Sequence, residues 1–321
     1  MNILLVGGGG YLGGAIAPLL LERGHSVTVF DRLLFGRAAI DPLAGHRNFN
    51  LIEGDIRDAQ AVAGAVKGRD AVILLAALVG EAACDRDPVE TVAVNYLGTL
   101  SVMKAAIYYG VKRFIFTSTD SCYGAQENVF LTEESPMKPI SLYAELKTKV
   151  EEEFLNMEGG ADFHPTILRL ATLYGLAPRM RFDLVINLLT REATVGQGAK
   201  IFSGEQWRPL VHVRDAAKAF ALALEAETGL VSGQVFNVGT NRQNVQFKDL
   251  AGLLLKVMPE ARIETVPHPP DLRDYHVCFD KIDRLLNFSA DYELLAGIGE
   301  IREALLDGRL GDPYDSKYRN A

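Results

Sequence analysis

The sequence predicts an α/β fold in which a doubly wound parallel sheet is followed by a smaller, mixed α/β lobe. Through the first half of the chain, short apolar runs alternate with stretches of helical pattern. A cluster of glycines follows the first apolar run directly, and the regular alternation ends near Gly175. Repeated strand–helix units form parallel sheets with right-handed crossovers, because a twisted strand and its helix pack back onto the sheet in that way.

Six apolar runs predict the strands of the sheet, at residues 3–6, 26–30, 49–52, 71–75, 113–117 and 165–169. Runs this short and this apolar are typical of strands that are covered on both faces. Between them, apolar residues at helical spacing predict helices over residues 11–22, 59–66, 90–109 and 142–157. These helices would form the crossovers on the two faces of the sheet.

The second half of the chain has a less regular pattern. It predicts helices over residues 183–193, 213–225, 247–255 and 300–306, with short strands at 201–202 and 234–238. We expect a first domain over residues 1–175 and a second lobe over residues 176–321, with the chain crossing between them. Since no clean linker separates the two, the sequence predicts one two-lobed body with a cleft.

Composition excludes several classes of protein. The 321 residues are 48% hydrophobic and 23% charged, which is ordinary for a globular protein. A formal net charge of −8 disfavours non-specific binding to nucleic acid. No apolar stretch reaches the roughly 18 residues of a membrane-spanning helix, so we expect no membrane partner. The three cysteines are far apart and form no CxxC pair, which predicts no metal site and a cytoplasmic location.

The glycine-rich segment 7–13 follows the first predicted strand and opens a helix. At this place Gly7 would permit a tight turn, Gly10 would let the backbone approach a pyrophosphate, and Gly13 would allow close packing of helix and strand. The N-terminus of the helix would supply N–H donors and partial positive charge. The spacing therefore predicts the dinucleotide site of a Rossmann domain, although a merely flexible turn is the alternative.

Asp31 ends the second predicted strand, near the spacing expected of a residue that binds ribose. Its carboxylate would accept hydrogen bonds from ribose hydroxyls and repel a 2′-phosphate, which favours NAD over NADP. Arg32 could host that phosphate instead, so the choice stays open at this point. The alternative is that Asp31 only caps a turn.

Tyr143 and Lys147 are four residues apart and would share one face of a helix. We expect the lysine ammonium to lower the pKa of the tyrosine, because it favours the phenolate. Such a tyrosine can exchange a proton with a substrate hydroxyl while a hydride moves to or from a nicotinamide. The hydroxyl-rich segment 117–121 follows a predicted strand, at the edge where open α/β sheets bind ligands. A polar turn is the alternative for that segment.

Further short motifs accompany the glycine turn and the tyrosine–lysine pair. They are Gly54-Asp55-Ile56, Leu75-Ala76-Ala77, Asn95 within residues 94–99, and the segments 119–124, 168–175 and 208–215. With these motifs the chain resembles the extended short-chain dehydrogenase/reductase family, and within it the NAD-dependent epimerase/dehydratase group. The resemblance extends over nearly the whole chain and implies an NAD-binding Rossmann domain and a nucleotide-sugar substrate.

The resemblance also implies roles for matching residues. Thr119, Tyr143 and Lys147 would form a catalytic triad in which Tyr143 is the acid and base. The residues that would bind the cofactor are Gly7, Gly10, Tyr11, Leu12, Gly13, Asp31, Arg32, Asp55, Ile56, Leu75, Ala76, Ala77, Asn95, Thr117, Tyr143 and Lys147.

The nucleotide sugar would be bound by Thr172, Asn187, Arg208 and Arg273. An arginine suits a diphosphate because its planar guanidinium can donate two parallel hydrogen bonds. Solvated surface positions or structural ion pairs are the alternatives for the two arginines.

Three reactions are compatible with these residues. We expect an NAD-dependent nucleotide-sugar epimerase that transiently oxidises a sugar hydroxyl at C4. The alternative is a 4,6-dehydratase that uses Asp120, since related dehydratases carry Asp-Glu after the triad threonine, whereas Ser121 replaces the glutamate here. A 4-ketoreductase would use the same triad but exchange its cofactor at every turnover. A non-enzymatic NAD sensor is the least favoured reading, because the triad is intact.

The resemblance also implies a homodimer. In the family, the helix that carries Tyr143 and the helix before it, residues 90–109, form a four-helix interface with a second copy. Apolar residues recur at helical spacing in this stretch. Packing of that face on the sheet is the alternative explanation of the pattern.

Overall fold

The computed structural model describes residues 1–126, 129–156, 162–202, 204–266 and 274–320. Its described strands form a seven-stranded parallel sheet in the order β3-β2-β1-β4-β5-β7-β11. These strands are β1 (Asn2–Val6), β2 (Ser26–Asp31), β3 (Phe49–Glu53), β4 (Ala71–Leu74), β5 (Arg113–Thr119), β7 (His164–Leu170) and β11 (Gln234–Val238). The strand order reverses between β1 and β4, which is where such sheets bind ligands. The predicted doubly wound sheet is confirmed.

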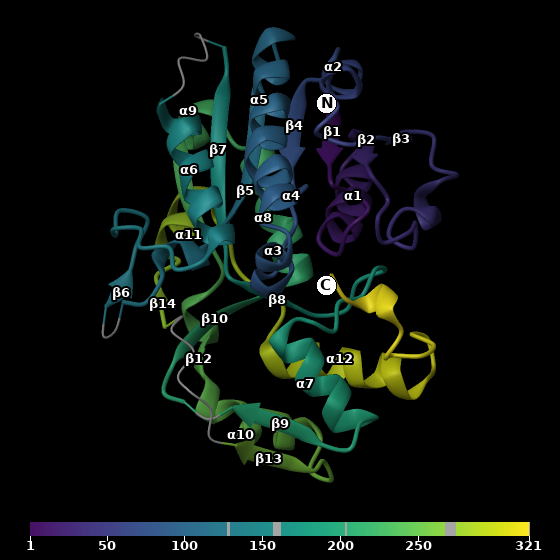
Figure 1. Cartoon of the computed structure of the whole chain (residues 1–321), viewed down its shortest axis with the longest axis vertical. Coiled ribbons are helices and arrows are strands. Elements are labelled where there is room, and N and C mark those ends of the chain that lie inside the picture. Colours follow the sequence, from purple (N-terminus) through teal and green to yellow (C-terminus); the bar gives the residue numbers. More distant parts are fainter. Residues whose placement is uncertain (127–128, 157–161, 203, 267–273, 321) are drawn as a thin grey trace.

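Helices cover both faces of the sheet (Figure 1). One face packs against α1 (Gly13–Glu22) and α8 (Val213–Glu225), which also contact each other. The other face packs against α2 (Ala59–Val66), α5 (Thr99–Tyr108) and α6 (Leu142–Asn156). The strands between these layers are buried on both sides, which explains their uninterrupted apolar sequences.

The predicted helix over residues 90–109 is interrupted. The structure has α4 (Pro88–Val92), a π-helical segment over residues 93–98, and then α5. At Gly98 a Cβ atom would lie 2.7 Å from Cγ1 of Ile56. The backbone therefore approaches Ile56 too closely for any side chain at this position. Asn95 points inward in the same segment, and π-turns inside helices are frequent at functional sites.

The strand over residues 234–238 is predicted to lie in the second lobe. In the structure it lies in the large sheet. It pairs in parallel with β7, and its Phe236 and Val238 are fully buried. The amphipathic α8 brings the chain back across the sheet, so an apolar strand can cover the open edge of β7. We therefore propose that the first domain comprises residues 1–171 together with α8 and β11, since β8 (Thr172–Tyr174) pairs with β10 and not with the large sheet.

The remaining residues form a smaller mixed lobe, at the bottom of Figure 1. Its strands are β8 (Thr172–Tyr174), β9 (Ala199–Phe202), β10 (Trp207–His212), β12 (Asn244–Gln246) and β13 (Ile263–Val266). Its helices are α7 (Val185–Thr194), α10 (Leu250–Val257) and α12 (Leu294–Leu306). A separate apolar cluster that includes Tyr174, Ile186, Leu210 and Ile298 forms its core. The lobe therefore has its own hydrophobic interior beside the sheet.

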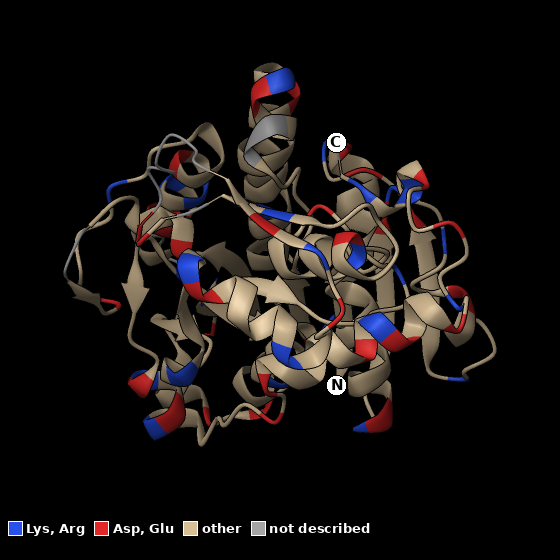
Figure 2. Cartoon of the chain, turned by 90° about the horizontal axis from the view of Figure 1, so that it is seen from below, with Lys and Arg blue, Asp and Glu red and all other residues tan. Residues whose placement is uncertain are grey.

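Three short elements connect the lobe with the sheet: β6 (Phe130–Leu131), β14 (His276–Val277) and α11 (Asp280–Leu286). Among the described helices, none is long and apolar enough to cross a membrane. Acidic and basic residues are interspersed in the view of Figure 2, so the net charge of −8 is not gathered on one patch there.

Candidate active site

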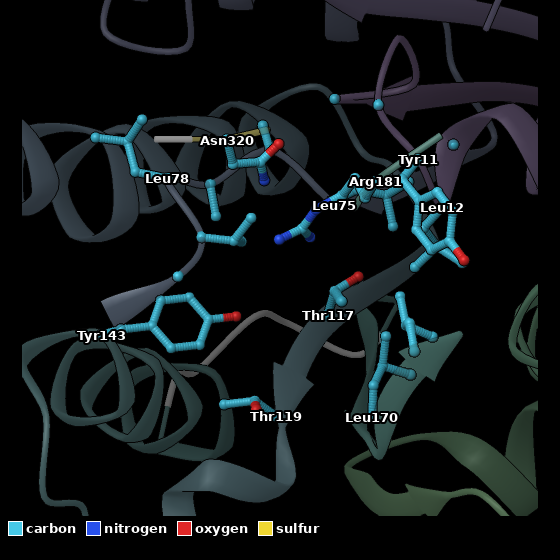
Figure 3. Close-up of a pocket in the computed structure, with 18 of the residues that line it drawn as sticks. Tyr11, Leu12, Leu75, Leu78, Thr117, Thr119, Tyr143, Leu170, Arg181 and Asn320 are labelled. Atoms are coloured by element: carbon cyan, nitrogen blue, oxygen red, sulfur yellow. The ribbon is translucent and has the colours of Figure 1, made fainter. Parts of the chain in front are cut away.

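A cleft of about 470 Å³ lies beyond the carboxyl ends of the central strands. It is lined by the glycine turn, the ends of β2, β4 and β5, the start of α6 and the segment after β8 (Figure 3). A volume of this size is ordinary for a ligand site. The position and the lining make this cleft the candidate active site.

The glycine turn opens the cleft at the N-terminus of α1. Gly7 has a φ of +84°, and a Cβ atom there would lie 2.5 Å from the backbone nitrogen of Ala76. A Cβ atom on Gly13 would lie 2.5 Å from Cα of Gly8, whereas one on Gly10 would meet only ordinary contacts. Gly7 and Gly13 are therefore required by the fold. Because no described side chain caps α1, its first N–H groups suit an anionic pyrophosphate.

Asp31 lines the cleft and also braces the glycine turn. Its Oδ2 accepts a hydrogen bond from the backbone nitrogen of Gly9 at 2.8 Å, and its Oδ1 accepts one from that of Leu33 at 2.7 Å. Burial raises the pKa of Asp31 above its usual value, which these two hydrogen bonds oppose. The two alternatives for Asp31, turn cap and cleft residue, are thus compatible.

Arg32 is engaged by carboxylates on the same side of the cleft. Its Nη1 lies 3.3 Å from Oδ2 of Asp55 and 3.0 Å from Oε1 of Glu90. Arg57 also pairs with Asp55 at 2.6 Å, and its hydrogen bond lowers the pKa of Asp55 to about 2. A 2′-phosphate would have to compete with these carboxylates for Arg32. The local charge therefore fits NAD better than NADP.

Residues 75–80 form one wall of the cleft, and Leu75, Ala76 and Ala77 line it as predicted from sequence. Asn95 is buried behind this wall. Its Oδ1 accepts from the backbone nitrogen of Leu78 at 2.7 Å, and its Nδ2 donates to the carbonyl oxygen of Leu78 at 2.8 Å. Asn95 thus shapes the wall through the backbone.

Thr117, Thr119, Asp120 and Tyr143 come together on the floor of the cleft, where β5 ends and α6 begins. Figure 3 shows the Tyr143 hydroxyl and the Thr117 and Thr119 side chains around the same space. Thr119 also accepts a hydrogen bond from the backbone nitrogen of Ser121 at 3.1 Å, which caps the 3-10 turn that follows β5. The strand end and its turn therefore hold this group in place.

Lys147 is buried beside Tyr143, outside the described lining of the cleft. Its Nζ donates to the carbonyl oxygen of Thr117 at 2.7 Å and lies 5.8 Å from the centroid of the Tyr143 ring. Burial lowers the pKa of Lys147 to about 8.

The expected lowering of the pKa of Tyr143 does not prevail in the protein without its cofactor. Burial raises the pKa of the Tyr143 phenol well above its usual value, and the cation that opposes this shift is Arg181. Desolvation of the phenolate exceeds the effect of the charges around it.

A buried polar network lies behind the floor of the cleft. Arg169 of β7 pairs with Glu151 of α6 at 2.6 Å, and the Ser118 hydroxyl donates to the same carboxylate. Arg169 also donates to the Tyr123 hydroxyl at 2.9 Å, which in turn donates to Oδ1 of Asn237 at 2.6 Å. These contacts connect β5, its 3-10 turn, α6, β7 and β11. The sequence signal was an arginine inside an apolar strand and a glutamate one turn beyond Lys147.

The residues expected to bind substrate fall into different places. Thr172 and Arg208 line the cleft, and the Arg208 guanidinium lies over the rings of Phe247 and Tyr275, 5.4 and 5.0 Å from their centroids. Arg273 lies outside the described residues.

Asn187 is fully buried and joins the two lobes. It accepts from the backbone nitrogen of Gly175 at 3.0 Å and donates to the Tyr11 hydroxyl at 3.2 Å and to the carbonyl oxygen of Arg181 at 2.9 Å. The Tyr11 hydroxyl donates to the carbonyl oxygen of Gly175 at 2.5 Å. Asn187 therefore holds the segment after β8 against the glycine turn.

Arg181 belongs to that segment, and its guanidinium points into the cleft (Figure 3). Asp183 holds it with two hydrogen bonds, at 3.0 and 2.7 Å. Arg179 of the same segment also lines the cleft.

Comparison with known proteins decides the family. Residues 3–239 match the NAD dependent epimerase/dehydratase family. The chain belongs to this family. It is therefore an NAD-dependent enzyme, and the cleft residues described above fit the cofactor.

Two of the curated relatives illustrate different activities within the family. A UDP-glucose 4-epimerase of Corynebacterium glutamicum is 30% identical over 256 residues, which cover 75% of each chain. A dTDP-glucose 4,6-dehydratase of Streptomyces niveus is 30% identical over 325 residues, which cover 96% of this chain and 94% of the dehydratase.

Two similar solved structures represent the same two activities. A UDP-glucose 4-epimerase from Thermotoga maritima with UDP-glucose has a TM-score of 0.84 and 29% identity, with 96% of this chain and 100% of the other covered. A dTDP-glucose 4,6-dehydratase from Streptomyces venezuelae, with NAD bound, has a TM-score of 0.86 and 25% identity, with 98% of this chain and 100% of the other covered.

Proposed function

We propose that this enzyme is a nucleotide-sugar epimerase that inverts C4 of the sugar by transient oxidation. The observation that carries the proposal is the grouping of Thr119 and Tyr143 in the cleft that the glycine turn opens. Ser121 stands where related dehydratases carry a glutamate, so the additional acid–base pair of a dehydratase is incomplete. The UDP-glucose 4-epimerases among the relatives support the same reaction.

Tyr143 would remove the proton of the C4 hydroxyl and later return it, and Thr119 would hold that hydroxyl by a hydrogen bond. Bound NAD would accept a hydride from C4 and give it back to the other face of the sugar. Lys147 would hold the nicotinamide ribose and favour the ionised Tyr143. Since burial alone disfavours ionisation of Tyr143, we expect Arg181 and Lys147 to provide the positive charge for this step.

The cofactor would lie along the glycine turn with its pyrophosphate at the N-terminus of α1. Asp31 would bind the adenosine ribose, Asp55 and Ile56 would contact the adenine, and Leu75, Ala76 and Ala77 would line the groove. Arg208 and Thr172 would contact the nucleotide sugar from the second lobe. We place Asn95 and Asn187 as residues that position the walls, because the hydrogen bonds of each go to the surrounding protein.

A 4,6-dehydratase is the second candidate because Asp120 is buried at the cleft beside Thr119. Asp120 would there protonate the leaving C6 hydroxyl. The dTDP-glucose 4,6-dehydratases among the relatives favour this candidate, and the one from Streptomyces niveus matches nearly the whole chain.

Incubation with UDP-glucose, UDP-galactose and dTDP-glucose, with and without added NAD, tests the proposal. Mass spectrometry and NMR of the products distinguish the reactions. We expect unchanged mass with inverted C4 and no consumption of NAD. Loss of water would establish the dehydratase instead. A change of two hydrogens with consumption of added cofactor would establish a reductase or an oxidase.

We also propose that the enzyme is a homodimer that works in the cytoplasm. Large apolar side chains are exposed on α4, the π-helical segment, α5 and α6, among them Val89 (81%), Leu97 (57%), Tyr108 (82%) and Leu155 (46%). Their position matches the four-helix interface of the family. The three cysteines carry reduced thiols, which suits a reducing compartment.

A further inference from the structure

The C-terminal tail reaches the active-site cleft, although its sequence gives no sign of this. Figure 1 shows the chain ending at the junction of the two lobes, and Figure 3 shows the Asn320 side chain at the cleft. The tail is attached to the segment between β8 and α7. The Phe182 backbone nitrogen donates to the carbonyl oxygen of Tyr318 at 2.9 Å, and the two rings pack edge to face with centroids 5.4 Å apart.

Arg179 connects this tail to the opposite side of the cleft. Its Nη2 donates to the carbonyl oxygen of Arg319 at 3.3 Å, and its guanidinium lies over the ring of Phe35, 4.1 Å from the centroid. Phe35 belongs to the loop after β2, four residues beyond Asp31, and both line the cleft. Arg179 therefore lies between the tail and the side of the cleft that Asp31 identifies with the adenosine ribose.

Arg179 and Asn320 each present a buried polar atom to the cleft. Within the part of the chain that the structure describes, Nε of Arg179 and Oδ1 of Asn320 are buried without a hydrogen-bond partner. Arg179 is only 4% exposed, and burial lowers its pKa to about 10. Buried polar atoms are nearly always satisfied by a partner, which indicates that a ligand completes this pair.

The position of Arg179 indicates the chemistry of that ligand. The preceding residue, Pro178, lies 3.6 Å from the place of a Cβ atom on Gly14, in the first turn of α1. The chain that carries Arg179 thus packs against the first turn of α1, and Arg179 lines the same cleft as the glycine turn. A pyrophosphate there would be bound by the helix from one side and by a guanidinium from the other.

We propose that Arg179 and Asn320 bind the pyrophosphate and adenosine ribose of NAD, and that residues 313–320 form a strap that slows release of the cofactor. The strap is held from outside by Arg191, whose Nη1 donates to the carbonyl oxygen of Pro313 at 3.3 Å and whose guanidinium lies 4.5 Å from the centroid of the Tyr314 ring. The proposal rests on the proposed function in taking this cleft as the NAD site. The strap extends the proposed function, because an epimerase regenerates its NAD at every turnover and gains from keeping that NAD bound.

The test measures NAD and not turnover. The dissociation rate of NADH is followed by fluorescence after displacement with excess NAD, for the wild type, Arg179→Gln, Asn320→Ala and a chain that ends at Tyr318. We expect Arg179→Gln and the shortened chain to release NADH on the order of tenfold faster or more, since each loses a charge-assisted or buried hydrogen bond. Arg309→Gln removes an exposed charge from the same part of the chain and should leave the rate unchanged.

Further measurements separate the alternatives. UDP affinity, measured by calorimetry, should stay within about twofold in all variants, because the strap acts on the cofactor. A loss of UDP affinity with unchanged NADH release would assign Arg179 to the substrate diphosphate and overturn the proposal. So would NADH release within twofold of wild type in both Arg179→Gln and the shortened chain. Melting temperatures without NAD identify a variant that is merely unfolded. If either Arg179→Gln or the shortened chain is unfolded, the NADH release rate of the other one tests the proposal.

Failure of the proposed function gives a different result. If no nucleotide sugar were converted but Arg179→Gln still released NADH faster, the proposed strap would be supported and the proposed epimerase activity would be wrong. If C4 were inverted and NADH release were unaffected in the variants, the epimerase activity would be supported and the strap would be wrong.

Discussion

At the scale of single residues, burial decides the electrostatics of Tyr143 and Lys147, the proposed catalytic pair. The spacing of Tyr143 and Lys147 predicts a shared helix face, and on α6 the buried Lys147 indeed lies beside the half-buried Tyr143. The same burial raises the pKa of the phenol and lowers that of the ammonium. In the protein alone, Tyr143 is therefore a protonated phenol at neutral pH.

Tyr143→Phe should remove turnover while leaving NAD binding intact. The substitution deletes the proton-transferring hydroxyl and keeps the ring, so we expect kcat to fall by about 10²–10⁴-fold. Tyr109→Phe, on α5's C-terminal side and away from the cleft, is the matched control. Full turnover of Tyr143→Phe would show that another group moves the proton.

Lys147→Met should stabilise the protein at pH 7 when NAD is not added. The folded-state pKa of about 8 lies below the value of 10.5 for an exposed lysine, so both states are charged at pH 7 and the folded state carries a desolvation cost on the order of 3 kcal/mol. Between pH 8 and 10.5 the folded state loses its proton first and the unfolded state binds more protons. The wild type therefore regains stability as the pH rises through this window.

Melting temperatures of wild type and Lys147→Met from pH 6.5 to 10.5 measure this effect. The difference should be largest below pH 8 and should shrink above it, whereas the exposed Lys112→Met should show no such change. A constant difference across the range would mean that the pKa of Lys147 is not lowered by burial.

At the scale of elements, α6 and β5 position the site together. Tyr143, Lys147 and Glu151 recur every four residues on α6, so one helix face carries the acid–base residue, the cation and the anchor of the buried network. β5 ends at Thr119, whose side chain caps the next turn. The Glu151–Arg169 pair joins this helix to β7 beneath the reacting groups.

Glu151→Gln should destabilise the protein by about 3–5 kcal/mol, because it leaves the Arg169 charge buried without its carboxylate. The double variant Glu151→Leu with Arg169→Met removes both charges and should recover much of this loss. Urea unfolding at pH 7 measures both. Asp41→Asn breaks the exposed pair with Arg37 and should have little effect. A double variant as unstable as Glu151→Gln would show that the hydrogen bonds of the network matter more than charge balance.

At the scale of the whole molecule, the smaller lobe is joined to the sheet through the active site. Tyr11 of the glycine turn and Asn187 of α7 hold the segment after β8, and that segment carries Arg179 and Arg181 to the cleft. The face of α4–α6 that points away from the sheet carries the exposed apolar residues of the proposed dimer.

Leu97→Glu combined with Tyr108→Glu should convert the enzyme to a monomer. Charges on both residues would have to be desolvated in a dimer interface, and each substitution also removes apolar area. Light scattering after size exclusion should show half the wild-type mass, with unchanged circular dichroism. Leu306→Glu places a charge on an exposed leucine of α12 in the second lobe and should leave the mass unchanged. A double variant of unchanged mass would place the interface elsewhere.

The sequence by itself determined the central strands of the sheet, the glycine turn and the residues proposed to be catalytic. Patterns of this kind are local: an apolar run predicts a buried strand, and glycines predict a turn that no side chain can enter. Gly7 illustrates this, since its positive φ and the nearness of Ala76 both follow from a tight turn after β1. Tyr143 and Lys147 could be found because four residues make one turn of a helix.

Only the tertiary structure decided which residues meet across long sequence distances. β11 joins the large sheet because the open edge of β7 is available to it, and Asn187 meets Tyr11 because the lobe folds back on the turn. The arrival of Asn320 at the cleft and the direction of the pKa shift of Tyr143 have the same origin. Burial and contact depend on the packing of the complete chain, which no local pattern specifies.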